Sequence, residues 1–249
     1  MKVVVFGVGN WDNKLQSDAD KLTYNEWYNR VRCFVGDPYT FIATGSYSEP
    51  KYNPLNVDLV QNGITKTNPY SRRWHYFRNG FQTGLWNSLL NLDFDILFHV
   101  QCRSLLGIDM IPYLEQFNKS SKQIMAPTSK TTTSKDDPYV EIGVMAMKPD
   151  AVRMLSTFSL RSSFCFAKDI TCEQEIRDMF RGSWYNPFPE IKTIKKRFTQ
   201  MGVDSEEMDM SKESFMKLPI IAAGKHASNE DIQDWCDAHP YKLKGGILK

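Results

Sequence analysis

The sequence predicts an α/β domain built on a mostly parallel, twisted sheet that is flanked by helices. A β-branched, apolar segment, Lys2–Val8, has the composition of a buried first strand. An amphipathic helix, Ser71–Leu90, leads into a second apolar segment, Phe94–Val100. Strands that alternate with helices in this way favour a parallel sheet. Right-handed crossovers would bring the strand ends, and with them a ligand, to one edge of that sheet.

The first half of the chain supplies the other elements of this alternation. Aromatic residues in helical spacing predict a helix over Thr23–Val35, and a second strand follows at Tyr39–Thr44. Glu49–Tyr70 is rich in proline and is expected to be mostly loop, with a short strand at Val57–Val60. The long helix carries its apolar residues three and four apart, namely Trp74, Phe77, Phe81, Leu85 and Leu89.

The second half continues with shorter elements. We expect a helix at Asp109–Asn118, a short strand near Gln123–Ala126 and one strand over Tyr139–Met147. Pro149 stands where a first helical residue would. Thr171 and Gln174 form a capping-box pattern at the start of a helix over Thr171–Arg181, and Gly182 would end it. The last expected elements are a strand at Ile220–Ala223 and a helix at Ser228–Ala238, which ends before His239-Pro240.

The bulk composition excludes several classes of protein. The 249 residues are 41% hydrophobic and 24% charged, with a formal net charge of +2, which gives no reason to expect nucleic acid or anionic lipid as a partner. Five scattered cysteines without a CxxC pair indicate reduced thiols rather than zinc ligands. No signal peptide or membrane span is evident, so we expect a cytoplasmic protein.

The glycine pair in Gly7-Val8-Gly9-Asn10-Trp11 follows the first strand and has three interpretations. A dinucleotide fingerprint would need a third glycine where Asp12 stands, so the match is partial. A tight turn is the simpler interpretation. In the third, the loop cups a nucleotide base, with Trp11 as a stacking surface.

Gln101, Cys102 and Arg103 follow the apolar strand, at the place where open α/β sheets bind ligands. A guanidinium there suits phosphate, although a single arginine after a strand is more often a solvated residue. Arg72 and Arg73 open the long helix, where cations oppose the helix dipole unless an anion is also present. A solvated basic face explains these two arginines equally well.

Acidic residues cluster at the start of the helix predicted over 171–181. A carboxylate among Asp169, Glu173 and Glu175 could act as a general base, but acidic residues in a first turn also simply complement the helix dipole. Glu141, between Val140 and Ile142, faces either solvent or a site. His99 lies within an apolar strand and is expected to be a core residue.

Taken together, these segments resemble the GT-A glycosyltransferases over roughly residues 1–190. The similar segments are KVVVFGVGNWD, RRWHYFRNGFQTGLWNSLL and DFDILFHVQCRSLLG, in that order and spacing. The segment YVEIGVMAMK is similar to the strand with acceptor contacts in this family, which implies roles for Glu141 and Gly143. The segment ITCEQEIRDMF is similar to the helix that often bears the catalytic acid.

The resemblance implies a Rossmann-like GT-A fold, a nucleotide-sugar donor and transfer to an acceptor hydroxyl. Most members hold Mn²⁺ or Mg²⁺ through an Asp-x-Asp motif, but the matching position here is Gln101-Cys102-Arg103, which lacks both carboxylates. Arg103, with Arg72 or Arg73, could neutralise the departing diphosphate instead; alternatively, the domain could bind without catalysing. His226 resembles a late histidine that some members use near the diphosphate.

We therefore expect a single domain over 1–249, in which 1–110 bind the nucleotide sugar and 111–249 supply acceptor contacts and C-terminal helices. Glu173 is the first candidate for the base, and Glu175 and Asp169 are the next. No tightly bound cofactor is expected, and a bound divalent metal is doubtful. The acceptor could be a glycan, a protein or a modified nucleic-acid base. The alternatives are an NAD-dependent oxidoreductase and an inactive sugar-nucleotide binding module. The expected donor-binding residues are Gly7, Val8, Gly9, Asn10, Trp11, Arg73, Gln101, Cys102 and Arg103.

Overall fold

The structure is a computed structural model, and it describes most of the sheet and the helices around it. The described residues are 1–9, 18–44, 59–62, 73–102, 104–126, 128–129, 139–140, 143–162, 176, 179–185, 212–222 and 229–242. Among these residues, none of the helices combines the length and the hydrophobicity that a membrane span requires.

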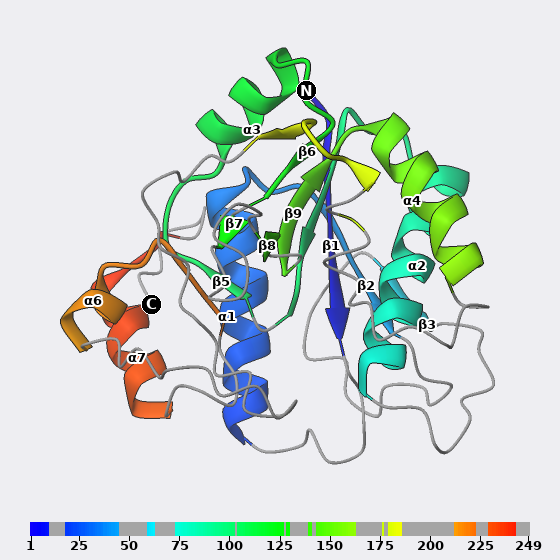
Figure 1. Ribbon diagram of the computed structural model, residues 1–249. Coiled ribbons are helices and arrows are strands. Elements are labelled where there is room, and N and C mark those ends of the chain that lie inside the picture. The colour runs from blue at the N-terminus through cyan, green and yellow to red at the C-terminus, as the bar shows by residue number, and fades with distance from the viewer. Residues whose placement is uncertain are drawn as a thin grey trace, which may run out of the picture.

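A seven-stranded sheet forms the centre of the molecule, in the order β10-β6-β9-β4-β1-β2-β3 (Figure 1). Only β9 runs antiparallel to its neighbours, so the predicted mostly parallel sheet is confirmed. The strands are β1 (Val3–Gly9), β2 (Tyr39–Thr44), β3 (Leu59–Asn62), β4 (Ile96–Val100), β6 (Ile124–Met125), β9 (Val144–Met147) and β10 (Trp184–Tyr185).

Helices cover both faces of the sheet. Helices α2 (Arg73–Asn91) and α4 (Pro149–Ser162) lie on one face, and α1 (Asp18–Phe34) lies on the other (Figure 1). Because side chains alternate along a strand, Val4 and Phe6 of β1 join the core beneath α2 and α4, whereas Val5 joins the core beneath α1. A sheet that is buried on both faces explains why its strands are continuous apolar runs.

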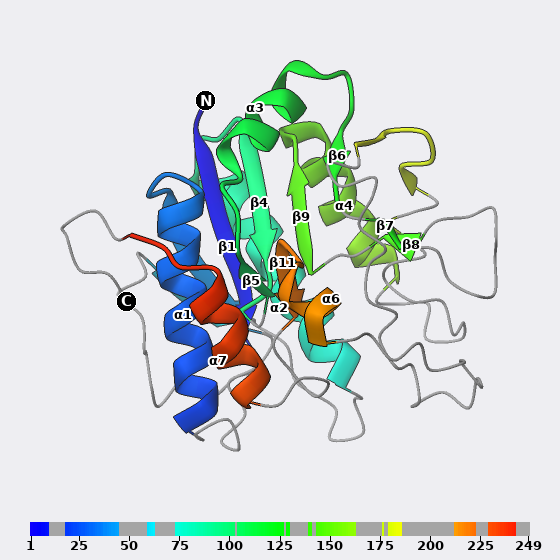
Figure 2. The ribbon, with the colours of Figure 1, turned by 90° about the vertical axis from the view of Figure 1, so that its left-hand side faces the viewer.

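The remaining elements are short. Strand β5 (Ser104–Leu106) follows β4 and pairs antiparallel with β11 (Ile220–Ala222), and helix α3 (Ile111–Lys119) follows β5. Helices α6 (Lys212–Met216) and α7 (Asn229–Ala238) flank β11 in sequence, and α7 lies beside α1 (Figure 2). A separate pair consists of β7 (Thr128–Ser129) and β8 (Tyr139–Val140).

The prediction of one strand over Tyr139–Met147 is wrong. The segment divides into β8 and β9, which belong to different sheets, and a turn at Gly143 precedes β9. Helix α1 also begins at Asp18, earlier than predicted. The prediction missed the first turns because they lack the aromatic spacing on which it relied. Gly182, the predicted helix stop, has a φ of 81°, a left-handed value that favours glycine.

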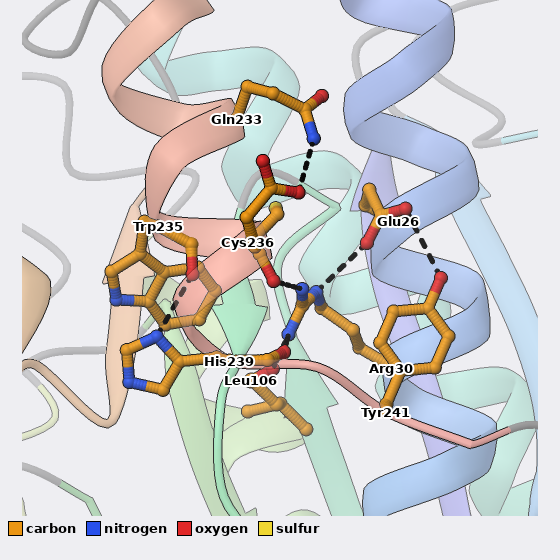
Figure 3. Close-up of polar contacts among 9 residues, drawn as sticks. Glu26, Arg30, Leu106, Gln233, Trp235, Cys236, His239 and Tyr241 are labelled. Carbon is orange, nitrogen blue, oxygen red and sulfur yellow. Dashed lines mark hydrogen bonds and ion pairs between the residues drawn. The ribbon is translucent and has the colours of Figure 1, made fainter. Parts of the chain in front are cut away.

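The C-terminal part is held to α1 and β5 by Arg30, whose side chain is fully buried (Figure 3). Its guanidinium donates to the carbonyl oxygens of Leu106 at 3.0 Å, His239 at 2.9 Å and Cys236 at 3.2 Å. Its Nε donates to Glu26 at 3.0 Å. One buried cation thus joins α1, β5 and the end of α7.

Aromatic rings complete this cluster. The Arg30 guanidinium lies 5.0 Å from the Trp235 ring centroid and 4.8 Å from that of Tyr241, whose hydroxyl donates to Glu26 at 3.1 Å. Burial raises the pKa of the Tyr241 hydroxyl to about 12 and that of the Cys236 thiol to about 11. Both groups are therefore neutral over the physiological pH range.

Candidate functional site

The candidate site lies at the edge of the sheet where the parallel strands end. Strand β1 ends at Gly9, which is in register with Thr44 at the end of β2, and Thr44 is in register with Asn62 at the end of β3. Strand β4 ends at Val100, directly before Gln101. This edge is where open α/β sheets bind their ligands.

Strand β9 brings a fifth segment to the same edge, because it runs antiparallel and begins where β4 ends. Val144 is in register with Val100, and the Gln101 amide donates to the carbonyl oxygen of Gly143 at 2.8 Å. Gln101, a predicted donor residue, and Gly143, a predicted acceptor residue, are therefore neighbours. Their predicted roles remain to be tested.

A tight turn carries the candidate motif from β4 to β5. The Ser104 amide donates back to the carbonyl oxygen of Gln101 at 2.6 Å, and the Cys102 amide donates to that of Val8 at 3.5 Å. The Gln101 side chain is half-buried and that of Cys102 is fully buried. The middle residue of the motif thus belongs to the core, whereas Gln101 reaches the surface.

Gly7 packs directly beneath this turn and does not form a turn itself. It lies inside β1, paired with Ile42, so the expectation of a tight turn at Gly7 is wrong. A Cβ atom on Gly7 would lie 2.5 Å from the Cys102 Sγ and 2.7 Å from Cζ2 of Trp27. Glycine is needed at this position because two side chains occupy the space where its own would be.

Trp27 is the residue of this region that sequence reasoning missed. It lies on α1, is fully buried, and donates from Nε1 to the carbonyl oxygen of Val100 at 2.9 Å. The sequence contained only a weak signal of this contact, a tryptophan on the apolar face of a helix. The partner is 73 residues away in sequence, and only the fold brings the two together.

Arg73 is the first residue of α2, and the chain direction places this helix start toward the candidate edge. The other end of α2 leads to Asp93, which pairs with Lys2 at the opposite, amino edge of the sheet. The side chain of Arg73 is outside the described part of the structure, as are several other predicted site residues. These are Asn10, Trp11, Arg103, Glu141, Asp169, Glu173, Glu175 and His226.

The chain returns to the candidate motif near its C-terminus. In the β5–β11 pair, Ala222 is in register with Ser104, the residue that follows Arg103. The segment that contains Lys225 and His226 comes next in the sequence. The strand predicted at Ile220–Ala223 therefore ends beside the motif.

The side chains of the motif do not suit the divalent metal that the family resemblance implies at this position. Mg²⁺ and Mn²⁺ take oxygen ligands, mainly carboxylates. Here the positions supply an amide, a thiol buried in the core, and a guanidinium. Within the described ranges, no group of three or more His, Cys, Asp or Glu side chains could hold a metal ion.

His99 is confirmed as a core residue. It is fully buried, and its ring centroid lies 4.8 Å from that of Phe6 and 5.0 Å from that of Phe81. It therefore belongs to the packing between β4, β1 and α2 rather than to the candidate site.

Comparison with known proteins identifies the fold. No protein-family model and no curated protein matches the sequence. Among solved structures, the chain is similar to an active-site mutant of LgtC, with a TM-score of 0.58 and 10% identity, covering 97% of this chain and 98% of that one. At this identity the likeness establishes the fold, which is that of the GT-A glycosyltransferases.

Two further structures are less similar. The galactosyltransferase LgtC in complex with donor and acceptor sugar analogs gives a TM-score of 0.48 at 11% identity, covering 74% of this chain and 72% of that one. The glycosyltransferase GlyE of Streptococcus pneumoniae TIGR4 gives 0.44 at 8% identity, covering 74% of this chain and 44% of that one.

The sheet order also bears on the alternative of an NAD-dependent oxidoreductase. The dinucleotide-binding fold has a mostly parallel sheet built from two βαβαβ halves, so that a second set of strands extends beyond the first. Here the neighbour of β4 is the antiparallel β9, which itself reaches the candidate edge. The topology therefore does not favour the dinucleotide alternative.

Proposed function

We propose that this protein is a glycosyltransferase that moves a sugar from a nucleotide-sugar donor to an acceptor hydroxyl. The observation that carries the proposal is the junction of Gln101 with Gly143 at the carboxyl edge of a GT-A sheet. In this arrangement the donor lies over the ends of β1 and β4, and the acceptor approaches from the start of β9.

The donor diphosphate is assigned to the turn that follows β4. Arg103 supplies the positive charge that a metal supplies in most GT-A enzymes, and Arg73 at the start of α2 adds a second cation. A guanidinium offers a planar set of donors that matches phosphate oxygens. Its charge would stabilise the leaving diphosphate as negative charge develops there.

The general base is assigned to the acidic group at 169–175, with Glu173 first. A carboxylate that accepts the acceptor's hydroxyl proton typically contributes on the order of a hundredfold or more to the rate. The sugar and the nucleotide are decided by the substrate screen.

A binding screen followed by a hydrolysis assay tests the proposal. Thermal shift is measured against UDP-, GDP- and CMP-sugars and against NAD(P), each with EDTA and with Mn²⁺. A ligand at a hundredfold excess over its Kd stabilises the folded state by about 2.7 kcal/mol. We expect one nucleotide sugar to raise the Tm and to be hydrolysed slowly without acceptor. Stabilisation by NAD(P) alone would contradict the proposal, and binding without any turnover would indicate an inactive binding module.

A further inference from the structure

We infer that Trp27, Gly7 and Cys102 form a buried support that fixes the turn from Gln101 to Ser104, and that Trp27 is a positioning residue for the proposed transfer. The functional half of this inference rests on the proposed function. The structural half rests only on the contacts beneath the turn.

The support starts from the carbonyl oxygen of Val100. Val100 is the last residue of β4 and is fully buried, so an unpaired carbonyl there would be costly. The Trp27 indole donates to this oxygen at 2.9 Å. Helix α1 thereby fixes the end of β4, one residue before the turn.

The same indole also packs against Gly7 of β1. Its Cζ2 atom lies 2.7 Å from the position that a Cβ on Gly7 would take, and the Cys102 Sγ lies 2.5 Å from it. The three residues therefore pack tightly against one another. A larger side chain at any of them would displace a neighbour, because the protein interior is close-packed.

The two residues to be substituted, Trp27 and Gly7, are uncharged, so their variants test the position of the turn and not its charge. An indole and a glycine carry no charge. Replacing Trp27 or Gly7 therefore leaves the electrostatics of the edge unchanged. Any loss of donor affinity would therefore come from displacement of the turn. Such a displacement also lowers the rate, since a shift of about 1 Å in a site can cost on the order of a hundredfold.

The chain offers matched controls for both substitutions. Trp235 is also fully buried and also donates from Nε1 to a backbone carbonyl oxygen, that of Leu218 at 3.0 Å. At Gly84 an added Cβ would meet the Phe6 ring at 2.4 Å, in the core on the other face of the sheet. Trp235→Phe and Gly84→Ala thus lose the same atoms or create the same crowding, away from the turn.

The experiment compares Trp27→Phe and Gly7→Ala with Trp235→Phe and Gly84→Ala. Donor Kd is measured by calorimetry with the nucleotide sugar that the screen selects, at a temperature where all four variants are folded. We expect the first two to weaken binding at least tenfold and the controls to stay within about twofold of the wild type. Wild-type affinity in Trp27→Phe and Gly7→Ala, or an equal loss in all four variants, would overturn the inference.

Amide hydrogen exchange provides a readout that needs no ligand. The Gln101 and Ser104 amides, which donate within and beside the turn, should exchange at least tenfold faster in Trp27→Phe and Gly7→Ala than in the controls. Equal protection in all four variants would overturn the support itself. If the wild type binds no nucleotide sugar, the proposed function and the positioning role fail together, and exchange still decides whether the support exists.

Discussion

Arg103 is the residue whose replacement best separates a site role from a structural one. It directly follows the fully buried Cys102 in the sequence. Arg103→Ala should lower turnover by about a hundredfold, the typical loss for one preorganised charge, while the Tm changes little. The measurement is kcat per folded molecule together with the melting curve.

Arg153→Ala is the matched control for Arg103→Ala. Arg153 is an exposed arginine near the start of α4, and this helix begins at the opposite edge of the sheet because β9 is antiparallel. It should retain wild-type turnover. An Arg103→Ala protein that melts early but keeps full activity per folded molecule would show that Arg103 is structural.

Glu173→Gln tests the assignment of the general base. The substitution keeps the size of the side chain and removes its charge, so the rate should fall by roughly a hundredfold or more. If Glu173 only complements a helix dipole, the change costs at most about 1 kcal/mol of stability and leaves the rate unchanged. Asp150→Asn removes an exposed acid in the first turn of α4 together with its ion pair to Arg153, and so gives an upper bound on the stability effect of a first-turn charge at another helix. Unchanged transfer by Glu173→Gln would move the search to Glu175, Asp169 and Glu141.

The buried hydroxyl of Tyr241 should make the free energy of unfolding depend on pH in the alkaline range. Burial raises the pKa of its hydroxyl to about 12 in the folded state, from an ordinary value of 10.0. Between these values the unfolded chain releases the proton and the folded protein keeps it, so the free energy of unfolding falls as pH rises from 10 to 12. Cys236, with its pKa raised from 9.0 to about 11, adds a similar fall between those values.

Urea unfolding of the wild type and Tyr241→Phe at several pH values checks this prediction. At pH 7 the variant should be less stable by about 1 kcal/mol, because it loses the hydrogen bond to Glu26. The difference should shrink above pH 10, since phenylalanine does not titrate. A gap between the two proteins that stays constant up to pH 12 would mean that the Tyr241 hydroxyl is not protected by burial.

At the scale of elements, α7 depends on Gly107 for its close approach to β5. A Cβ on Gly107 would lie 2.8 Å from Cζ2 of Trp235 and 2.9 Å from Cδ2 of His239. Gly107→Ala should therefore push α7 away from β5, strain the bonds of Arg30 to Leu106 and Cys236, and cost about 1–3 kcal/mol. Hydrogen exchange over 229–238 reports the loosening of this helix.

Gly182→Ala is the control for Gly107→Ala, because it strains the backbone without crowding any side chain. Gly182 has a φ of 81°, and no atom lies within 4 Å of the position of an added Cβ. Its replacement should lower stability through backbone strain alone and leave exchange over 229–238 unchanged. Equal protection of α7 in Gly107→Ala and the wild type would mean that α7 does not depend on the glycine.

The longer elements could be predicted from the sequence, and the short ones could not. Strand β2 has the predicted bounds, and β1, β4 and α2 differ from prediction by a few residues, because each carries a periodic or continuous apolar pattern. Strands β5 and β10 have three and two residues, too few to show a period, and they form only because a partner strand is present.

The candidate site could be predicted only in part. Gln101 was proposed because a polar residue stands at the end of an apolar strand, and Gly143 was proposed only from the family resemblance; both roles stay predictions. Trp27, Gly7 and Cys102 could not be recognised as one unit, since their contacts join three segments that lie far apart in sequence. No local sequence pattern indicates a close approach between a glycine and two distant side chains.

At the scale of the whole molecule, one sheet joins the two predicted parts of the chain. Strands β6, β9 and β10 come from 111–249 and continue the sheet that β1 to β4 form. Near the C-terminus, the β5–β11 pair and the Arg30 cluster bring the chain back to the strand that follows the motif. The division into a donor-binding part, 1–110, and an acceptor-binding part, 111–249, stays a prediction.

The central claim is that the edge formed by β1, β4 and β9 binds a nucleotide sugar without a divalent metal. The claim follows from the chemistry of Gln101, Cys102 and Arg103, which the family resemblance aligns with the carboxylates of a metal site. Calorimetric titration of the best nucleotide sugar, first in EDTA and then in Mn²⁺, tests it most directly. We predict Kd values that agree within about threefold, which is less than 1.4 kcal/mol. A loss of affinity of about tenfold or more in EDTA would contradict the account.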